Sequence, residues 1–343
     1  MSAESLPGGG DAALARADAR ARAAVDDLFL ADEARLGDRV RTTSMAMLRA
    51  CVDAAEAAVR TEVARRLREA GDAAGARTAT LPAGDAFHVL EAAGILRDAD
   101  LIEEIVAEAA RDWLEERLLP EPDAGQYGLL ARLADDRDAD VREAAARFAA
   151  IHLRARAALP LVRLPAQLHR HLWWQVAAAI RTDLPASPLA DRILAEAVVS
   201  LAEAAGDEPL RRAAGQLAER IDGRPGRRGA LLTDVLRDRS VVLFCAILAR
   251  WVGLDYGQAR MLLLQPAETL LWAALRSAGL TRAEMAGIGT VLADADPRRD
   301  LDLLADALDK VAALPVAAAE QALMPLRLHP QLRSAVRALE AAR

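Results

Sequence analysis

The chain has 343 residues, of which 53% are hydrophobic and 28% are charged, and this composition excludes an intrinsically disordered protein. The net charge is −7 at pH 7 and the sequence pI is about 5.4. We therefore expect no nucleic-acid partner, because a basic surface supplies most of the affinity of nucleic-acid-binding proteins.

Residues 1–22 are predicted to form a flexible tail, because the three glycines at 8–10 are costly to order and the residues that follow are polar. This segment has no apolar stretch of the kind found in secretory signals. The longest apolar run, 241–249, is far shorter than the roughly 20 residues needed to cross a bilayer. We therefore expect a cytoplasmic protein without a membrane-spanning segment.

From residue 23 onward, apolar residues recur at steps of three and four, which is typical of amphipathic helices. Gly94, Gly253 and Gly279 are each followed by Leu or Ile, and this pattern predicts a glycine-terminated helix followed at once by a new one. Short turns of this kind pack consecutive helices antiparallel. Cys51 and Cys245 lie in apolar helical stretches and are predicted to be buried free thiols. The predicted fold class is all-α.

Three segments, 55–67, 138–150 and 207–219, share an acidic residue, an apolar–Arg pair and small residues at helical spacing. They resemble the second helix of HEAT repeats and predict an irregular, HEAT-like α–α superhelix. Segments rich in Pro and Gly mark the linkers, and we place the main boundary near Pro160. The predicted parts are the tail 1–22, an N-terminal helical region 23–159 and a C-terminal helical region 160–343.

The motifs of common enzymes are absent from the sequence. Lys310 is the only lysine and does not belong to a phosphate-binding loop. Asp136, Asp138 and Asp140 mimic the start of a calcium loop, but the Gly and Glu that such a loop needs do not follow. There is no zinc motif and no nucleophile motif. We therefore predict no metal, no cofactor and no enzymatic activity.

The most distinctive segment contains His169, His171, Trp173, Trp174 and Arg181. On a helix the two histidines point about 200° apart, so they cannot chelate one ion together. The two tryptophans point about 100° apart, so one can lie in the core while the other borders a groove. Two interpretations stay open: both tryptophans fill the junction between the two halves, or the segment forms a groove for a partner or ligand.

Arg298 and Arg299 follow Pro297 in a predicted loop, where they either face solvent or bind an anion.

Segments 164–181, 241–263 and 271–288 resemble an uncharacterised bacterial family, catalogued as domain of unknown function two-three-three-six. The family's late motif falls on these residues: Phe244, Leu248–Ala249, Gly253–Leu254, Ala259–Arg260 and Ala278–Gly279–Leu280. Where the family has a His–Asp pair, this chain has Leu264–Gln265–Pro266. The resemblance implies a HEAT-like helical fold and no established activity.

Three functions compete. The first is a non-catalytic scaffold or regulatory protein that binds another protein, with a homodimer as an open alternative. The second is a module that binds a small ligand or nucleotide near Trp173, Trp174 and Arg181, since arginine can clamp phosphate without lysine. The third is a HEAT-like nucleic-acid-modifying enzyme, which the net charge disfavours.

Overall fold

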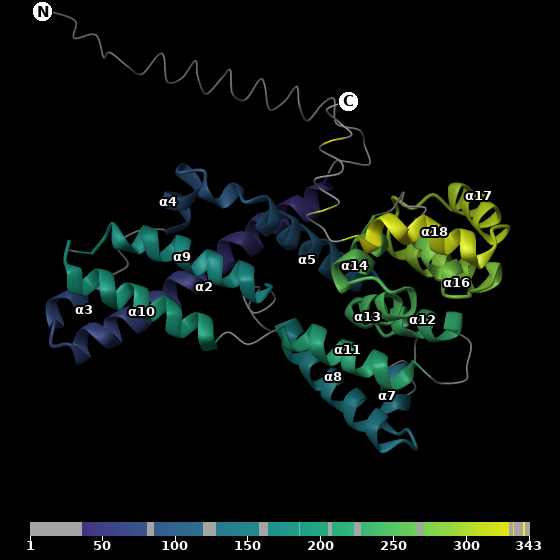
Figure 1. Cartoon of the computed structure of the whole chain (residues 1–343), viewed down its shortest axis with the longest axis horizontal. Helices are drawn as coiled ribbons and strands as arrows, with labels where there is room; N and C mark the ends of the chain where they lie inside the picture. The colour runs from purple at the N-terminus through teal and green to yellow at the C-terminus, as the bar shows by residue number, and fades with distance from the viewer. Residues whose placement is uncertain are drawn as a thin grey trace, which may run out of the picture.

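The computed structural model describes residues 36–80, 86–118, 128–157, 164–184, 186–204, 208–222, 228–265 and 270–328, together with Leu332 and Leu339. Within these residues it contains sixteen α-helices, one 3₁₀ turn and no strand, which confirms the all-α prediction. The helices pack against one another as in an irregular helical-repeat fold (Figure 1). The predicted tail 1–22 lies outside the described residues.

One group of helices, here called the first lobe, is built around the 32-residue helix α2. Its elements are α2 (Asp38–Glu69), α3 (Ala73–Thr80), α4 (Ala86–Ala92), η2 (Ile95–Arg97), α5 (Ala99–Arg117), α9 (Ala166–Arg181) and α10 (Pro188–Ala204). Apolar residues of α2 at helical spacing, among them Val52, Val59 and Val63, are fully buried. They form one face of α2, which packs against α5, α9 and α10.

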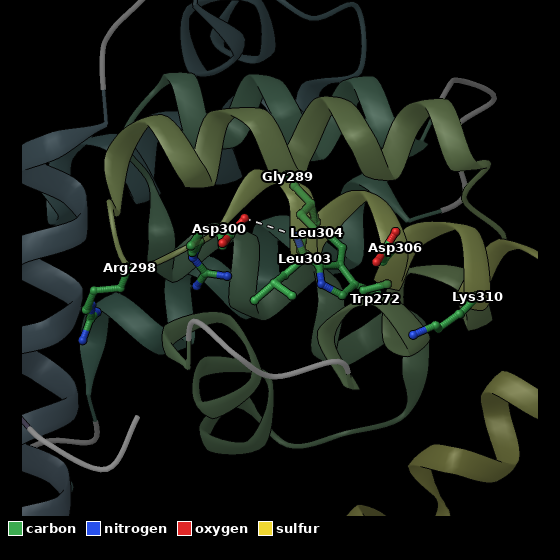
Figure 2. A pocket seen from close by; sticks show the side chains of 10 residues that line it. Trp272, Gly289, Arg298, Asp300, Leu303, Leu304, Asp306 and Lys310 are labelled. Atoms are coloured by element: carbon green, nitrogen blue, oxygen red, sulfur yellow. Dashed lines mark hydrogen bonds between the residues drawn. The ribbon is translucent and has the colours of Figure 1, made fainter. Parts of the chain in front are cut away.

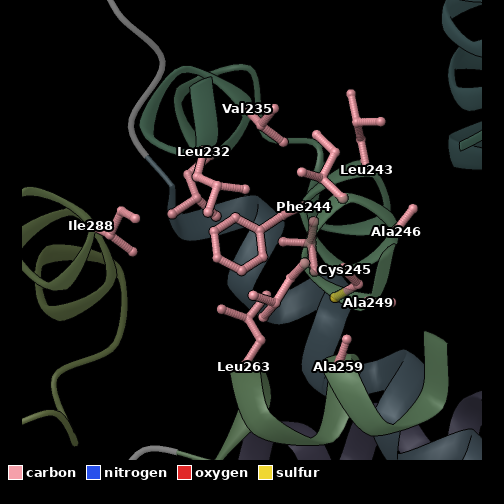
Figure 3. Packing of buried hydrophobic residues seen from close by; sticks show 14 of the residues in the cluster. Leu232, Val235, Leu243, Phe244, Cys245, Ala246, Ala249, Ala259, Leu263 and Ile288 are labelled. Carbon is pink, nitrogen blue, oxygen red and sulfur yellow. The ribbon is translucent and has the colours of Figure 1, made fainter. Parts of the chain in front are cut away.

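The remaining helices, here called the second lobe, surround α13. They are α7 (Leu129–Ala134), α8 (Ala139–Ala157), α11 (Pro209–Ile221), α12 (Arg228–Arg237), α13 (Val241–Val252), α14 (Tyr256–Leu264), α15 (Leu270–Ser277), α16 (Arg282–Ala295), α17 (Leu301–Ala312) and α18 (Val316–Arg327). Ten of the twelve α13 side chains are buried, and Figure 3 shows Phe244 between Leu232 of α12 and Leu263 of α14. The apolar run 241–249 is therefore the core of this lobe.

The predicted helix ends are confirmed. Gly94, Gly253 and Gly279 have φ of 73°, 67° and 85°, a left-handed conformation that side chains with a Cβ adopt at a cost. Complete capping boxes begin α14, from Asp255, and α16, from Thr281. These local signals fix where one helix stops and the next starts.

Both cysteines are buried free thiols, as predicted. Burial raises the pKa of the Cys245 thiol to about 12. The sulfur of Cys245 therefore carries its proton at neutral pH and fills space in the core of the second lobe.

The two lobes do not coincide with the predicted regions 23–159 and 160–343. Helices α9 and α10, which follow residue 160, pack on α2 of the first lobe. Helices α7 and α8, which precede it, belong to the second lobe, where α8 packs on α11. Pro160 itself lies outside the described residues. Helical periodicity identifies the buried face of each helix but not the helix that covers it, so the interleaving is not visible in the sequence.

Among the described residues, no single helix is long and apolar enough to span a membrane. Helices α13 and α14 reach that length and composition only when taken together, across a bend of 115°.

Candidate functional site

The five residues singled out in the sequence all lie on α9, but they do not form one site. Trp173 is only 5% exposed and belongs to the core of the first lobe, and the His169 ring packs against it at a centroid distance of 4.2 Å with the two rings tilted by 30°. Burial lowers the pKa of His169, so its imidazole is neutral at pH 7. Trp174 is 43% exposed. One tryptophan therefore lies in the core and the other on the surface.

The other two residues of this set contact carboxylates of neighbouring elements. His171 Nε2 lies 3.5 Å from Oδ2 of Asp98, the residue that caps α5. Arg181 forms an ion pair with Asp191 of α10. These contacts fasten α9 to its neighbours within the first lobe.

The most unusual feature of the structure is a cluster of buried and half-buried charged side chains where α5 meets α11 and α14. This junction cluster consists of Glu104, Glu108, Glu208, Arg211 and Arg260. Arg260 donates from Nη2 to Glu104 Oε2 at 2.6 Å and from Nη1 to Glu108 Oε1 at 3.0 Å. Arg211 contacts Glu104 and lies 2.6 Å from Glu208 Oε2. The cluster thus joins three helices through two guanidinium groups.

The charges in the junction cluster are unequally compensated. Burial opposes ionisation of Glu104, but hydrogen bonds and charge from Arg260 and Arg211 outweigh it and hold the pKa of Glu104 below its usual value. The pKa of Glu208 is raised to about 7, mainly by burial; the nearby Glu104 and Glu108 carboxylates act in the same direction, and Arg211 and Arg260 oppose them. Glu208 is therefore the carboxyl group of the cluster that titrates near neutral pH.

Further contacts extend the cluster along α5. Arg111 lies 2.7 Å from Glu108 Oε2, and Glu115 accepts a hydrogen bond of 3.1 Å from the backbone N–H of Val241 at the start of α13. The Arg211 guanidinium lies over the Tyr256 ring, with its Cζ atom 4.7 Å from the ring centroid. Helix α5 contributes apolar residues to both lobes, so these polar contacts attach the first lobe to the second.

Beside the cluster is a junction groove of about 410 Å³ between α2, α5 and α14. Its apolar lining is Leu36, Val40, Val106, Ala107, Ala110, Met261 and Leu264. Its polar lining includes Glu103, Arg260, Gln265 and Arg298. The groove therefore combines an apolar wall with a few charged groups, as small-molecule sites do.

A second cavity, the α17 groove of about 340 Å³, lies at the far end of the second lobe (Figures 1 and 2). Trp272, Leu303 and Leu304 form its apolar part, and the ammonium group of Lys310 points toward its mouth. The other charged residues of the lining are Arg298, Arg299, Asp300 and Asp306. A Cβ added at Gly289 would lie 2.6 Å from Leu304 Cδ2, so this glycine lets α17 approach α16. Leu303 is 69% exposed, and the groove is open to solvent along α17.

The loop between α16 and α17 contains the two arginines noted in the sequence. Arg298 donates from Nε and Nη2 to the two carboxylate oxygens of buried Asp296, both at 2.9 Å. Arg299 donates to the Leu263 carbonyl, and burial lowers its pKa to about 10. Neither expected arrangement describes both residues. The Arg299 side chain is buried, whereas Arg298 is partly exposed and lines both the junction groove and the α17 groove.

The junction cluster was not predicted, although part of its signal is present in the sequence. Arg211 belongs to one of the apolar–Arg pairs of the repeated pattern. In another copy, Arg60 binds Glu56 of its own helix at 2.7 Å and Asp183 of the α9–α10 turn at 2.6 Å. In two of the three copies, the arginine of the apolar–Arg pair therefore forms an ion pair with another element of the fold.

Among the residues that the structure describes, no group of three or more His, Cys, Asp or Glu side chains is arranged to hold a metal ion. No protein-family model matches the chain, and no curated protein or solved structure is detectably similar to it. The family resemblance stays a prediction.

Proposed function

We propose that this protein is a non-catalytic helical scaffold that binds another protein through the α17 groove. The observation that carries the proposal is Leu303 of α17, which is 69% exposed at the rim of a cavity whose floor is formed by Leu304 and Trp272. An exposed apolar side chain that continues into an apolar groove is a common feature of protein interfaces. Burying one such leucine would contribute about 1.5–3 kcal/mol.

The shape and charge of the groove favour an amphipathic helix as the bound segment. Such a helix would lay its apolar face on Leu303, Leu304 and Trp272, which is a recurrent mode of peptide recognition. Lys310 would pair with a carboxylate of the partner. The position of α17 at the end of the molecule, away from α3, leaves room for a large partner (Figure 1).

The chemistry of the buried polar groups supports a non-catalytic protein. Arg260 and Glu104 of the junction cluster bind each other in a buried ion pair. The Cys245 thiol, with a pKa of about 12, is a poor nucleophile at neutral pH. These groups stabilise the fold.

The test is affinity capture from the native cells with two matched variants. Leu303→Glu places a charge in the α17 groove, whereas Leu153→Glu makes the same change at an equally exposed leucine of α8, which is 72% exposed. We expect one partner to be captured by the wild type and by Leu153→Glu and to be lost with Leu303→Glu. Equal thermal unfolding of the two variants would show that both are folded. A partner retained by Leu303→Glu would contradict the proposal.

A further inference from the structure

We propose that the junction groove is a separate site for a small amphiphilic organic anion, in which an aliphatic or aromatic body carries one carboxylate or similar group. This inference goes beyond the scaffold function, and Arg298 is the one residue that lines both the junction groove and the α17 groove. The volume of about 410 Å³ lies within the range of about 300–1,000 Å³ typical of small-molecule pockets.

The walls of the groove come from both lobes and are mainly aliphatic. Val40 of α2 and Val106 of α5 belong to helices of the first lobe, whereas Met261 and Leu264 belong to α14 of the second. An apolar ligand body would therefore replace water between the lobes, which is favourable at about 25 cal/mol for each Å² buried.

The charges in the lining favour an anion. Arg260 and Arg298 both line the groove, against one carboxylate, Glu103. The carboxylate partners of Arg260, Glu104 and Glu108, are not part of the lining. A guanidinium group can bind a carboxylate through paired hydrogen bonds, so the ligand's anionic group is expected beside these arginines.

The Arg298 guanidinium is held in place with donors to spare. Its Nε and Nη2 bind Asp296, and it lies 5.1 Å from the centroid of the Trp113 ring on α5. Among the residues that the structure describes, Nη1 has no hydrogen-bond partner. Because Asp296 and Trp113 already fix the side chain, little conformational entropy is lost when an anion binds to it.

The experiment is isothermal titration calorimetry of the full chain with three probes of equal length, octanoate, 1-octanol and octylammonium, below their micelle concentrations. We expect octanoate to bind most tightly. Arg298→Gln is expected to weaken octanoate binding about tenfold, which corresponds to about 1.4 kcal/mol. Glu103→Gln is expected to strengthen it about threefold by removing an exposed like charge. Ala107→Phe, which fills the groove and leaves the arginines in place, is expected to abolish binding.

Three results would overturn the proposal. Tighter binding of octylammonium, lost in Glu103→Gln, would show that the groove takes cations. Equal binding of all three probes would show that its charges play no part. Octanoate binding that is lost in Lys310→Gln and kept in Ala107→Phe would place the anion in the α17 groove, because Lys310 lines only that groove and Ala107 lines only the junction groove. The scaffold proposal is tested separately, by Leu303→Glu in the capture experiment. Failure of either proposal can therefore be distinguished from failure of the other.

Discussion

Arg260 is the residue whose removal tests the junction cluster most severely. It makes hydrogen bonds of 2.6 Å and 2.8 Å to Glu104 and 3.0 Å to Glu108, and its side chain is 7% exposed. Removing one partner of a buried ion pair costs about 3–5 kcal/mol, because a buried charge is left without compensation. Arg211 stays in contact with both carboxylates. We therefore expect Arg260→Met, which keeps the apolar volume, to lower the free energy of unfolding by about 3 kcal/mol.

The assay is urea-induced unfolding at pH 7, followed by circular dichroism. The matched control is Arg39→Met, which breaks an ion pair of 2.5 Å with Glu116 whose side chains are 65% and 54% exposed. Exposed pairs of this kind contribute about 0–1 kcal/mol. The expected difference between the two variants comes from burial, since both remove one arginine from an ion pair between helices.

A double-mutant cycle with Glu104→Gln isolates the interaction. In the Glu104→Gln background, Arg260→Met should lower the free energy of unfolding by about 1–2 kcal/mol less than it does in the wild type, because fewer buried charges are left uncompensated. The reasoning is refuted if Arg260→Met costs as little as Arg39→Met, or if the effects of Arg260→Met and Glu104→Gln simply add.

Three further predictions concern pH, the core and a close helix contact. The pKa of Glu208 is raised from 4.5 to about 7, so the folded chain binds more protons than the unfolded chain between these values, and the free energy of unfolding falls as the pH rises through them. In urea unfolding, Glu208→Gln should remove this pH dependence. It should raise the free energy of unfolding by roughly 1 kcal/mol at pH 8, a figure reduced for solvent screening, and change it little at pH 4. An unchanged pH profile would contradict this prediction. In the same assay, Trp173→Ala should lower the free energy of unfolding by about 3–5 kcal/mol and Trp174→Ala by less than about 1 kcal/mol, because only Trp173 is buried. Equal losses in the two variants would contradict this prediction. Gly229→Ala should lower the free energy of unfolding by about 1–3 kcal/mol, measured as a lower Tm, because the new Cβ would overlap Glu284 Cβ of α16. An unchanged Tm would show that α12 and α16 can move apart without loss of stability.

Local features of the fold could be predicted from the sequence. The left-handed glycine at Gly253 and the capping boxes from Asp255 and Thr281 depend on residues within one helical turn, so a short pattern determines them. The burial of Cys51 and Cys245 follows equally from their apolar neighbours.

Helix partners could not be predicted in the same way. Helix α8 packs on α11, and α9 and α10 pack on α2. Helices rich in Ala and Leu present similar ridges and grooves to one another, so many pairings bury similar apolar area. The choice among them depends on contacts between residues far apart in the chain, such as that between Arg60 and Asp183.

The candidate site could be predicted from the sequence only in part, for the same reason. The angle between Trp173 and Trp174 on a helix indicated that one could be buried and the other exposed. The junction cluster, in contrast, brings Arg211 and Arg260 to Glu104 from 107 and 156 residues away. Charged residues on a helix are usually exposed, so nothing in the local pattern distinguishes a buried Glu104 from a solvated one.

The most direct test of the scaffold proposal uses Lys310, the only lysine of the chain. A zero-length carbodiimide reagent joins an amine to a carboxylate in contact with it, and peptide mapping separates Lys310 from the N-terminal amine. With the partner captured by the wild type, we expect a cross-link from Lys310 to a carboxylate within an amphipathic helix of that partner. The cross-link should disappear in Leu303→Glu and persist in Leu153→Glu. A partner that binds stably without any cross-link to Lys310, and that leaves α17 unprotected in hydrogen exchange, would contradict the proposal.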